Sequence, residues 1–269
     1  MRCPALLVSA LVTSLLPAPA AIIVSDSFDD GDRTNGTDPL DAGWYKNSNA
    51  ETLSVADNEL SLSSTVTFQG ITGTMPSTVT LAAGESIELT FTFRFLTTPG
   101  NTASSFRFGL YNDNAETVTA DTDPRESANS GHNSFGYYAN VSTGTSASNA
   151  FYREFGGESG ILSGNDRSTA VASNSTNLGL DDTDSHTASL RITATGTGVS
   201  LSGSVDGFSL GPDNANAPDG YLTFNQIAFS NNSGDAIALD DIIVTYIPEP
   251  STGLLGGLAG FLVCFRRRK

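Results

Sequence analysis

The chain of 269 residues carries 13 Lys and Arg against 29 Asp and Glu, which gives a formal net charge of −16. Residues 21–247 hold 28 of the acidic residues but only eight basic ones, and so negative a field repels nucleic acid and anionic lipid, which excludes both as partners. Both cysteines, Cys3 and Cys264, lie outside this region, which excludes disulfides and thiol chemistry from it.

The first 20 residues have the organisation of a secretory signal peptide. Arg2 supplies a positive start, and residues 5–16 are apolar apart from Ser and Thr. Ala18 and Ala20 then provide the small residues that signal peptidase needs before its cleavage site. We therefore expect signal peptidase to cut after Ala20 or the following residue. The remaining residues 21–247 are long enough to bury a core as one domain.

The first strong strand signal lies in the middle of the chain. Residues 86–95 place Ile, Leu and three Phe on one face and Glu, Thr and Arg on the other, which is the period of a half-buried strand. Residues 104–112 repeat the pattern. The linking residues 97–101 read Thr-Thr-Pro-Gly-Asn, a turn composition, so the two runs predict a β-hairpin.

A second alternating pair follows later in the chain. Residues 187–195 and 199–205 alternate on either side of a Gly-Thr-Gly turn and predict another hairpin. Residues 221–229 and 236–246 predict two closing strands. The stretch 165–185 is polar and predicts a loop, and outside the two terminal signals no helical periodicity runs beyond about ten residues.

The second hairpin carries a recognisable order of residues. His186 is followed by an alternating strand, a tight turn and a second strand that ends in Val-Asp-Gly at 205–207. This order resembles a hairpin of concanavalin A-like and laminin-G-like jelly rolls. Segments 26–31 and 239–244 also resemble the first and last strands of such secreted sandwiches, which lie side by side. The resemblance implies an all-β fold over residues 21–247, an antiparallel two-sheet jelly-roll sandwich.

Catalytic residues are not recognisable. Glycan hydrolases of the concanavalin A-like fold need two carboxylates roughly 5 to 9 Å apart, and the Glu-x-Asp-x-x-Glu pattern of one branch is missing from the sequence. Glu85 and Glu88 would point to opposite faces of a strand. Residues 21–247 lack Cys and a Gly-x-Ser-x-Gly elbow, and His186 is expected to be a surface or turn residue. We expect the protein not to be an enzyme.

Aspartates crowd the start of the domain, and two more lie in the last predicted strand. Calcium binds six to eight hard oxygens from carboxylates and carbonyls. The jelly-roll resemblance implies a structural calcium where the terminal strands meet, with Asp30 and either Asp240 or Asp241 as ligands. The alternative is that these side chains cap turns and face water.

Sugar binding would require exposed aromatic rings that stack on pyranose faces. Three pairs of adjacent aromatic residues are suitable, because alternation would point one member of each pair outward. The candidate residues are Trp44, Tyr137, Tyr138 and Tyr152. The alternative is that one member of each pair packs in the core while the other covers the edge of a sheet.

The tail begins with Pro248-Glu249-Pro250, followed by an apolar segment at 251–265. As a helix at about 1.5 Å per residue, residues 253–265 would span about 20 Å, less than the roughly 30 Å of a bilayer core. A short span followed by a basic stop suits a temporary hold in the membrane, with its cations on the cytoplasmic side. The basic stop consists of Arg266, Arg267, Arg268 and Lys269.

Residues 248–269 resemble the PEP-CTERM sorting signal of Gram-negative bacteria. The resemblance implies that the inner membrane holds the precursor transiently, that an exosortase cuts near Pro-Glu-Pro, and that the product reaches the cell surface or extracellular matrix. An ordinary C-terminal membrane anchor is the alternative, and it leaves Pro-Glu-Pro unexplained.

These features together predict a non-catalytic exported protein of the envelope or extracellular matrix, structural or associated with extracellular polysaccharide. A calcium-dependent, lectin-like carbohydrate-binding protein is the first alternative. A glycan-active enzyme, with carboxylates far apart in the sequence, is the second. No cofactor other than calcium is indicated.

Overall fold

The computed structural model describes residues 19–34, 38–49, 51–64, 69–99, 105–122, 131–144, 148–156, 158–159, 162, 168–212, 215–218, 220–231 and 236–249. Most of the predicted signal peptide, including Ala18, lies outside the described residues. The same holds for Pro250 and the rest of the predicted tail, including Arg266, Arg267 and Arg268. Within the described ranges, no helix is long and apolar enough to cross a membrane.

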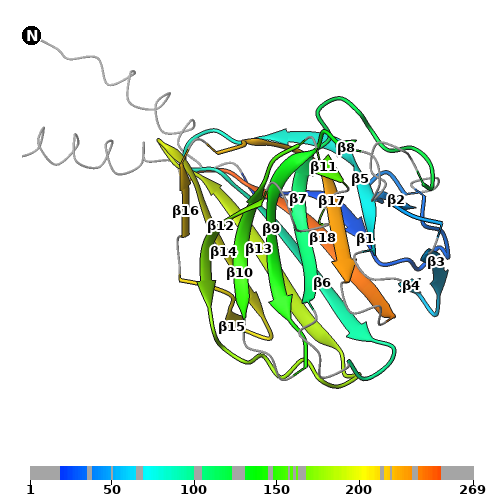
Figure 1. Ribbon diagram of the computed structural model, residues 1–269. Helices are drawn as coiled ribbons and strands as arrows, with labels where there is room; N and C mark the ends of the chain where they lie inside the picture. The colour runs from blue at the N-terminus through cyan, green and yellow to red at the C-terminus, as the bar shows by residue number, and fades with distance from the viewer. Residues whose placement is uncertain are drawn as a thin grey trace, which may run out of the picture.

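The described residues form two large sheets and one small one (Figure 1). The nine-stranded sheet contains β1 (Ala21–Asp26), β3 (Glu51–Ala56), β4 (Glu59–Ser64), β6 (Ser86–Phe95), β13 (His186–Ala194), β14 (Gly198–Val205), β15 (Phe208–Ser209), β16 (Ala215–Pro218) and β18 (Ile237–Ile247). The seven-stranded sheet contains β2 (Gly43–Lys46), β5 (Gln69–Thr80), β7 (Ser105–Asn112), β9 (Phe135–Ser142), β10 (Asn149–Glu154), β12 (Ser168–Asn174) and β17 (Thr223–Asn231). The small sheet pairs β8 (Gly131–His132) with β11 (Glu158–Ser159).

The order of strands is that of an antiparallel sandwich. The larger sheet runs β15-β14-β13-β6-β18-β4-β3, with β1 paired to β18 and β16 paired to β14. The other runs β12-β10-β9-β7-β17-β5-β2. The two sheets lie face to face with the core between them (Figure 1). This arrangement confirms the prediction of an all-β, antiparallel two-sheet jelly roll.

The alternation at 86–95 forms β6, whose apolar side chains are buried at every second position. The predicted hairpin with the next run is wrong, because β6 pairs with β13 and β18 whereas β7 pairs with β9 and β17 in the other sheet. Phe91 of β6 instead meets Phe106 and Phe108 of β7 across the sandwich, with ring centroids 6.1 and 5.0 Å apart. Burial of each such ring contributes about 2 kcal/mol, which favours stacking the two apolar faces.

The second predicted hairpin is confirmed. β13 and β14 pair antiparallel, from Ala188 opposite Val205 to Ala194 opposite Val199, across a short turn. The polar stretch that follows β10 is not only a loop, because its residues Ser168–Asn174 form the edge strand β12.

The first and last strands lie side by side, as the sequence predicts. Ala21 of β1 lies opposite Tyr246 of β18, and Asp26 lies opposite Ile242. β18 also pairs with β6 and β4, so the C-terminal strand is a central member of its sheet. A bulge interrupts its pairing with β6 after Asp240.

Candidate functional site

The N-terminal and C-terminal ends of the sandwich lie next to each other, because the first and last strands pair. Ala20 is exposed directly before β1, and Glu249 is exposed just after β18. A Cβ added to Gly84 would lie 2.7 Å from the side chain of Glu249, so this glutamate packs against the turn before β6. The segments predicted for signal peptidase and exosortase therefore leave the sandwich from neighbouring strands.

The predicted calcium ligands do not assemble into a site. Asp30 accepts a hydrogen bond from the N–H of Asp32 at 2.9 Å, and Asp240 accepts one from the N–H of Asp241 at 2.7 Å. In the described part of the chain, no group of three or more His, Cys, Asp and Glu side chains is placed to hold a metal ion. The capping alternative describes these contacts, because Asp30 satisfies a backbone donor in the turn after β1 and Asp240 satisfies one at the bulge of β18.

Trp44 and Tyr137 are core residues, so the prediction of exposed rings at these positions is wrong. Both are fully buried because they occupy inward positions of β2 and β9. The indole Nε1 of Trp44 donates to Asp26 at 2.7 Å. Burial raises the pKa of the Tyr137 hydroxyl to about 12, and this hydroxyl accepts the N–H of Tyr221 at 2.7 Å.

Tyr138 and Tyr152 point the other way, onto the outer face of the seven-stranded sheet. They lie opposite each other on β9 and β10, and their rings stack at 4.9 Å with an angle of 11° between planes. Tyr138 is buried and Tyr152 is half-buried. They belong to an apolar group that we call the outer-face cluster, which consists of Tyr111, Tyr138, Tyr152, Leu162 and Ala228.

Two glycines shape the outer face beneath Tyr111. A Cβ added to Gly109 or to Gly136 would lie 2.7 or 2.8 Å from atoms of the Tyr111 ring. Larger residues at either position would therefore displace the ring. Burial, followed by the neighbouring Glu154, raises the pKa of the Tyr111 hydroxyl well above its ordinary value, so it stays protonated and acts as a donor.

Polar groups tie the outer-face cluster together. The hydroxyl of Tyr111 donates to Oε2 of Glu154 at 2.6 Å, and Oε1 of Glu154 accepts the N–H of Leu162 at 3.1 Å. The carbonyl of Leu162 accepts Nη1 of Arg107 at 2.6 Å, while Nε of Arg107 donates to Asn140 at 2.8 Å. Leu162 has a positive φ of 59°, an uncommon conformation for a branched side chain. Both backbone polar groups of a strained residue are thus held by side chains of the sheet.

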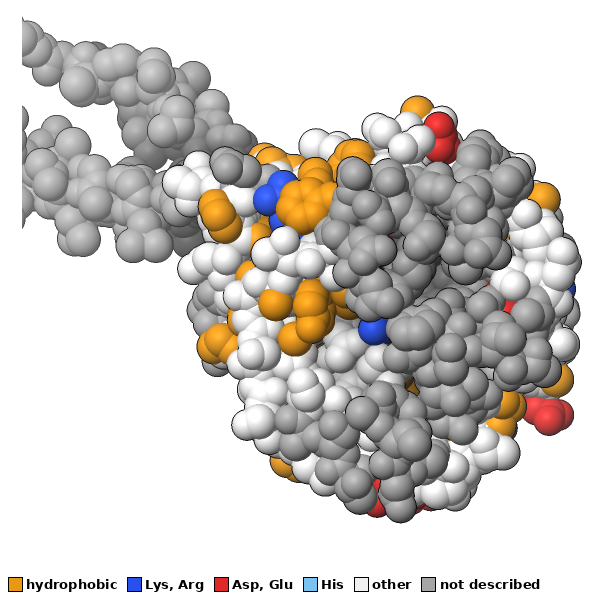
Figure 2. Space-filling model, in the orientation of Figure 1, with side chains coloured by type: hydrophobic (Ala, Val, Ile, Leu, Met, Phe, Trp, Pro, Cys, Tyr) orange, Lys and Arg blue, Asp and Glu red, His pale blue; other side chains and the backbone are white. Residues whose placement is uncertain are grey.

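A second aromatic group was not predicted from the sequence. Arg153 lies over the rings of Phe155 and Tyr221, 4.7 and 4.6 Å from their centroids. Phe135 packs on Tyr221 at 4.3 Å, and all four side chains are half-buried. Hydrophobic side chains also gather beside Lys or Arg on the face in view in Figure 2. We call these four residues the Tyr221 group, which only the pairing of distant strands brings together.

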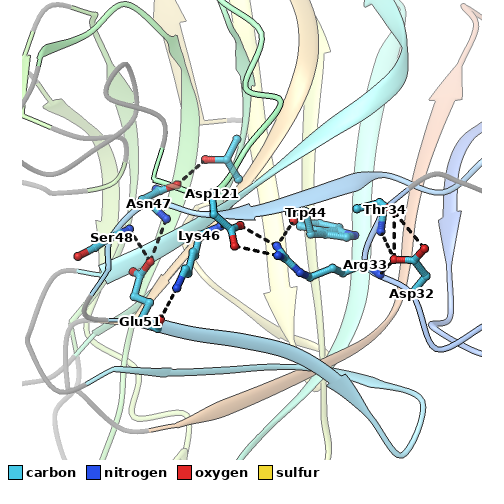
Figure 3. Close-up of polar contacts among 10 residues, drawn as sticks. Asp32, Arg33, Thr34, Trp44, Lys46, Asn47, Ser48, Glu51 and Asp121 are labelled. Atoms are coloured by element: carbon cyan, nitrogen blue, oxygen red, sulfur yellow. Dashed lines mark hydrogen bonds and ion pairs between the residues drawn. The ribbon is translucent and has the colours of Figure 1, made fainter.

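A polar network ties β2 to the loop at 113–122 (Figure 3). Arg33 makes a two-pronged ion pair with Asp121 at 2.7 and 2.8 Å, and it also donates to the carbonyl of Trp44. At the other end of β2, Oε2 of Glu51 accepts the N–H groups of Asn47 and Ser48, each at 2.9 Å. These contacts fix the positions of the loops on either side of β2, and Arg33 and Asp121 neutralise each other.

Burial of Glu51 has an electrostatic consequence. The residue is only 2% exposed, and burial raises the pKa of its carboxyl to about 7, although the N–H groups of Ser48 and Asn47 oppose the shift. Near neutral pH the carboxyl therefore exchanges a proton inside the fold.

Comparison with protein-family models and with curated protein sequences found no match. Two solved structures share the fold. One is a Bacillus subtilis protein of unknown function with a galectin-like fold, 14% identical with a TM-score of 0.50, covering 87% of this chain and 100% of that chain. The other is a legume lectin-like domain from Entamoeba histolytica, 13% identical with a TM-score of 0.50, covering 86% of this chain and 99% of that chain. At these identities the likeness supports a concanavalin A-like β-sandwich fold alone.

Proposed function

We propose that the chain is an exported, non-catalytic β-sandwich protein of the bacterial envelope or extracellular matrix, sorted by an exosortase through its Pro-Glu-Pro tail and associated with polysaccharide. The observation that carries the proposal is where the paired terminal strands begin and end. β1 begins at Ala21, directly after the predicted signal-peptidase cut, and β18 ends at Ile247, directly before Pro248. Both cuts would leave every strand of the sandwich intact.

The shared exit edge suits display on a membrane. Before the tail is cut, the precursor is held at the edge where Ala21 lies opposite Tyr246. After the cut releases the protein to the extracellular matrix, the outer faces of both sheets meet the polymer.

Association with polysaccharide is supported by the Tyr221 group. Half-buried aromatic rings with a cation above them offer apolar faces and a hydrogen-bond donor to a sugar. The formal net charge of −20 over residues 21–247 favours neutral polymers over acidic ones. The galectin-like and lectin-like structures agree with this proposal only at the level of fold.

The non-catalytic part of the proposal is supported by the outer-face cluster. A tyrosine base would need a lowered pKa, whereas burial raises that of Tyr111. Both oxygens of Glu154 accept hydrogen bonds, from Tyr111 and from the backbone of Leu162. In this proposal both groups instead hold the backbone of Leu162 against the outer face of the sheet.

The proposal is tested by following the full chain in a host that has an exosortase. We expect a product that begins at Ala21 or one residue later, lacks the tail and collects in the extracellular polymer. With Pro248, Glu249 and Pro250 each replaced by Ala, we expect the tail to remain and the protein to stay with the membrane. Asp181→Ala is the control, because Asp181 is exposed and adjoins Asp182, which contacts His186 at the opposite end of β6 from both cuts. Unchanged processing of the tail variant would show that the sorting proposal is wrong, and release of sugar fragments from the polymer would contradict the absence of catalysis.

A further inference from the structure

Gln226 is a buried polar side chain that the fold does not use. It lies on β17, is 1% exposed, and neither its Nε2 nor its Oε1 has a hydrogen-bond partner among the residues that the structure describes. A buried amide without partners costs free energy, because it has given up its hydrogen bonds to water. An apolar side chain of the same length would avoid that cost. The presence of an amide at this position therefore indicates a ligand that would supply the missing hydrogen bonds.

The strand register places Gln226 on the same outer face as the polar groups described above. Tyr111 of β7 lies opposite it on one side, and Thr74 of β5 lies opposite it on the other. The same row continues through Gly136 to Glu154 on β10. Direct cross-strand neighbours share a face and lie about 5 Å apart. The unused amide is thus the next position in the row that contains Tyr111 and Glu154.

Small or already engaged neighbours surround the amide. Ala228 follows it on the same face of β17 and belongs to the outer-face cluster. The hydroxyl of Thr74 donates to the carbonyl of Val118, and the hydroxyl of Thr72 donates to Asn47. The described side chains beside Gln226 therefore do not hydrogen-bond its amide, whose donor and acceptor lie buried and unpaired.

Leu162, on the same outer face, has a strained backbone conformation. Its positive φ persists because Glu154 and Arg107 bind its N–H and carbonyl. Uncommon backbone conformations that surrounding contacts enforce cluster at ligand-binding and switch regions. Tyr152, the half-buried member of the cluster, lies in the neighbouring row.

We propose that the outer face of the seven-stranded sheet holds a ligand site read by the amide of Gln226, and that the site takes a neutral sugar unit. A carboxamide presents one donor and one acceptor side by side. The complementary chemistry is an adjacent acceptor and donor, which a vicinal pair of sugar hydroxyls supplies at once. The N–H and C=O of the N-acetyl group of an amino sugar point in opposite directions, so that group engages one side of the amide and leaves the other side to a hydroxyl. Glu154 and the negative chain disfavour a uronate. The inference rests on the polysaccharide association proposed above and names its site and ligand class.

The test is calorimetric titration of the full chain with three trisaccharides, built from N-acetylglucosamine, from glucose and from a uronic acid. We expect binding of the first or the second, which identifies the source of the donor–acceptor pair, and no binding of the third. Gln226→Met keeps the length and removes the amide, so we expect at least a tenfold loss of affinity with an equal or higher Tm. Asn216→Leu, on exposed β16, is the matched control and should bind normally.

If Gln226→Met fails to fold, Gln226→Leu replaces it, since it also removes the donor and the acceptor without placing a charge at this buried position, and the same loss is expected. Wild-type protein that binds none of the trisaccharides, or a Gln226 variant that binds as wild type does, would overturn the inference. Failure of the proposed function is distinguishable: the protein would bind a trisaccharide through Gln226 yet be absent from the extracellular polymer of its host.

Discussion

Nδ1 of His186 lies 2.8 Å from Oδ2 of Asp206, and its Nε2 lies 3.2 Å from Oδ1 of Asp182. His186 begins β13, and Asp206 follows the last residue of β14, so the contact joins the two open ends of the hairpin. Asp206 also accepts the N–H of Thr187 at 2.9 Å. The histidine is 6% exposed, which corrects its prediction as a surface or turn residue. The His and Asp of the recognisable hairpin motif thus have a structural role.

Asp206→Ala is expected to lower the free energy of unfolding by about 1 kcal/mol, the usual value of a lost partly exposed hydrogen bond. Burial opposes ionisation of Asp206, but the N–H of Thr187 and the ring of His186 outweigh it and hold the pKa of this carboxyl below its usual range. Its stabilisation is therefore present above about pH 4 and lost as the pH falls through the lowered pKa. Urea unfolding at pH 7 and pH 3 measures the difference.

The exposed Asp181 provides the control, and Asp181→Ala should leave stability unchanged at both pH values. A difference between wild type and Asp206→Ala that persists undiminished at pH 3 would contradict the role of the ionised carboxylate.

Glu51→Gln is expected to stabilise the protein at alkaline pH. Because burial raises the pKa of Glu51 to about 7, the contribution of this residue to wild-type stability is largest below about pH 4.5 and declines as the pH rises through 7. Gln keeps an oxygen that accepts the N–H groups of Asn47 and Ser48 but carries no charge. At pH 8 we expect the variant to be more stable by on the order of 1 to 3 kcal/mol, measured by urea unfolding.

The advantage of Glu51→Gln should disappear at about pH 3.5, below the ordinary Glu pKa of 4.5, where the wild-type carboxyl is protonated in the folded and the unfolded state. Glu88→Gln, on the outer face of β6, is the control and should show no such pH dependence. A Glu51→Gln protein that is less stable than wild type at pH 8 would show that the ionised carboxylate is the stabilising form.

Trp44→Phe tests whether Trp44 serves the core or a ligand. The substitution leaves the carboxylate of Asp26 without its indole donor, so we expect a loss of about 2 kcal/mol in the free energy of unfolding. Association with polysaccharide should not change. Tyr45→Phe, at the adjacent half-buried position, is the control for both measurements. Weaker polysaccharide association with unchanged stability would return Trp44 to the ligand-binding candidates.

Tyr221→Ala is expected to weaken association with neutral polysaccharide about three- to tenfold, because the ring stacks with Phe135 and carries Arg153 over its face. Sedimentation with an insoluble neutral polymer measures the effect. Phe208→Ala removes another aromatic side chain, 58% exposed on the edge strand β15 of the nine-stranded sheet, and should bind as wild type does. Equal losses in the two variants would indicate nonspecific adsorption.

The sequence predicts which face of a strand is buried better than it predicts which strands pair. Alternation at 86–95 correctly identifies the buried side of β6, but a period of two carries no information on which strand lies beside it, and β7 joined the other sheet. The hairpin at 186–205 was predictable because its turn is short enough to force the pairing. Alternation also predicts that one of Tyr137 and Tyr138 faces outward without indicating which, and the outward ring, that of Tyr138, is buried. Gln226 gives no local signal, since its surroundings depend on a register that extends across several strands.

The central position of β18 in its sheet means that the domain can complete folding only late in its synthesis. During synthesis from the N-terminus, β1, β4 and β6 are made long before β18, the strand with which all three pair. Ala21, for example, cannot pair until Tyr246 has been synthesised. Contacts of such long sequence separation form slowly and expose strand edges until they close. A chain that stops before residue 237 leaves β1 without a partner and leaves β4 and β6 with one unpaired edge each, so only a polypeptide that includes β18 acquires the complete sheet.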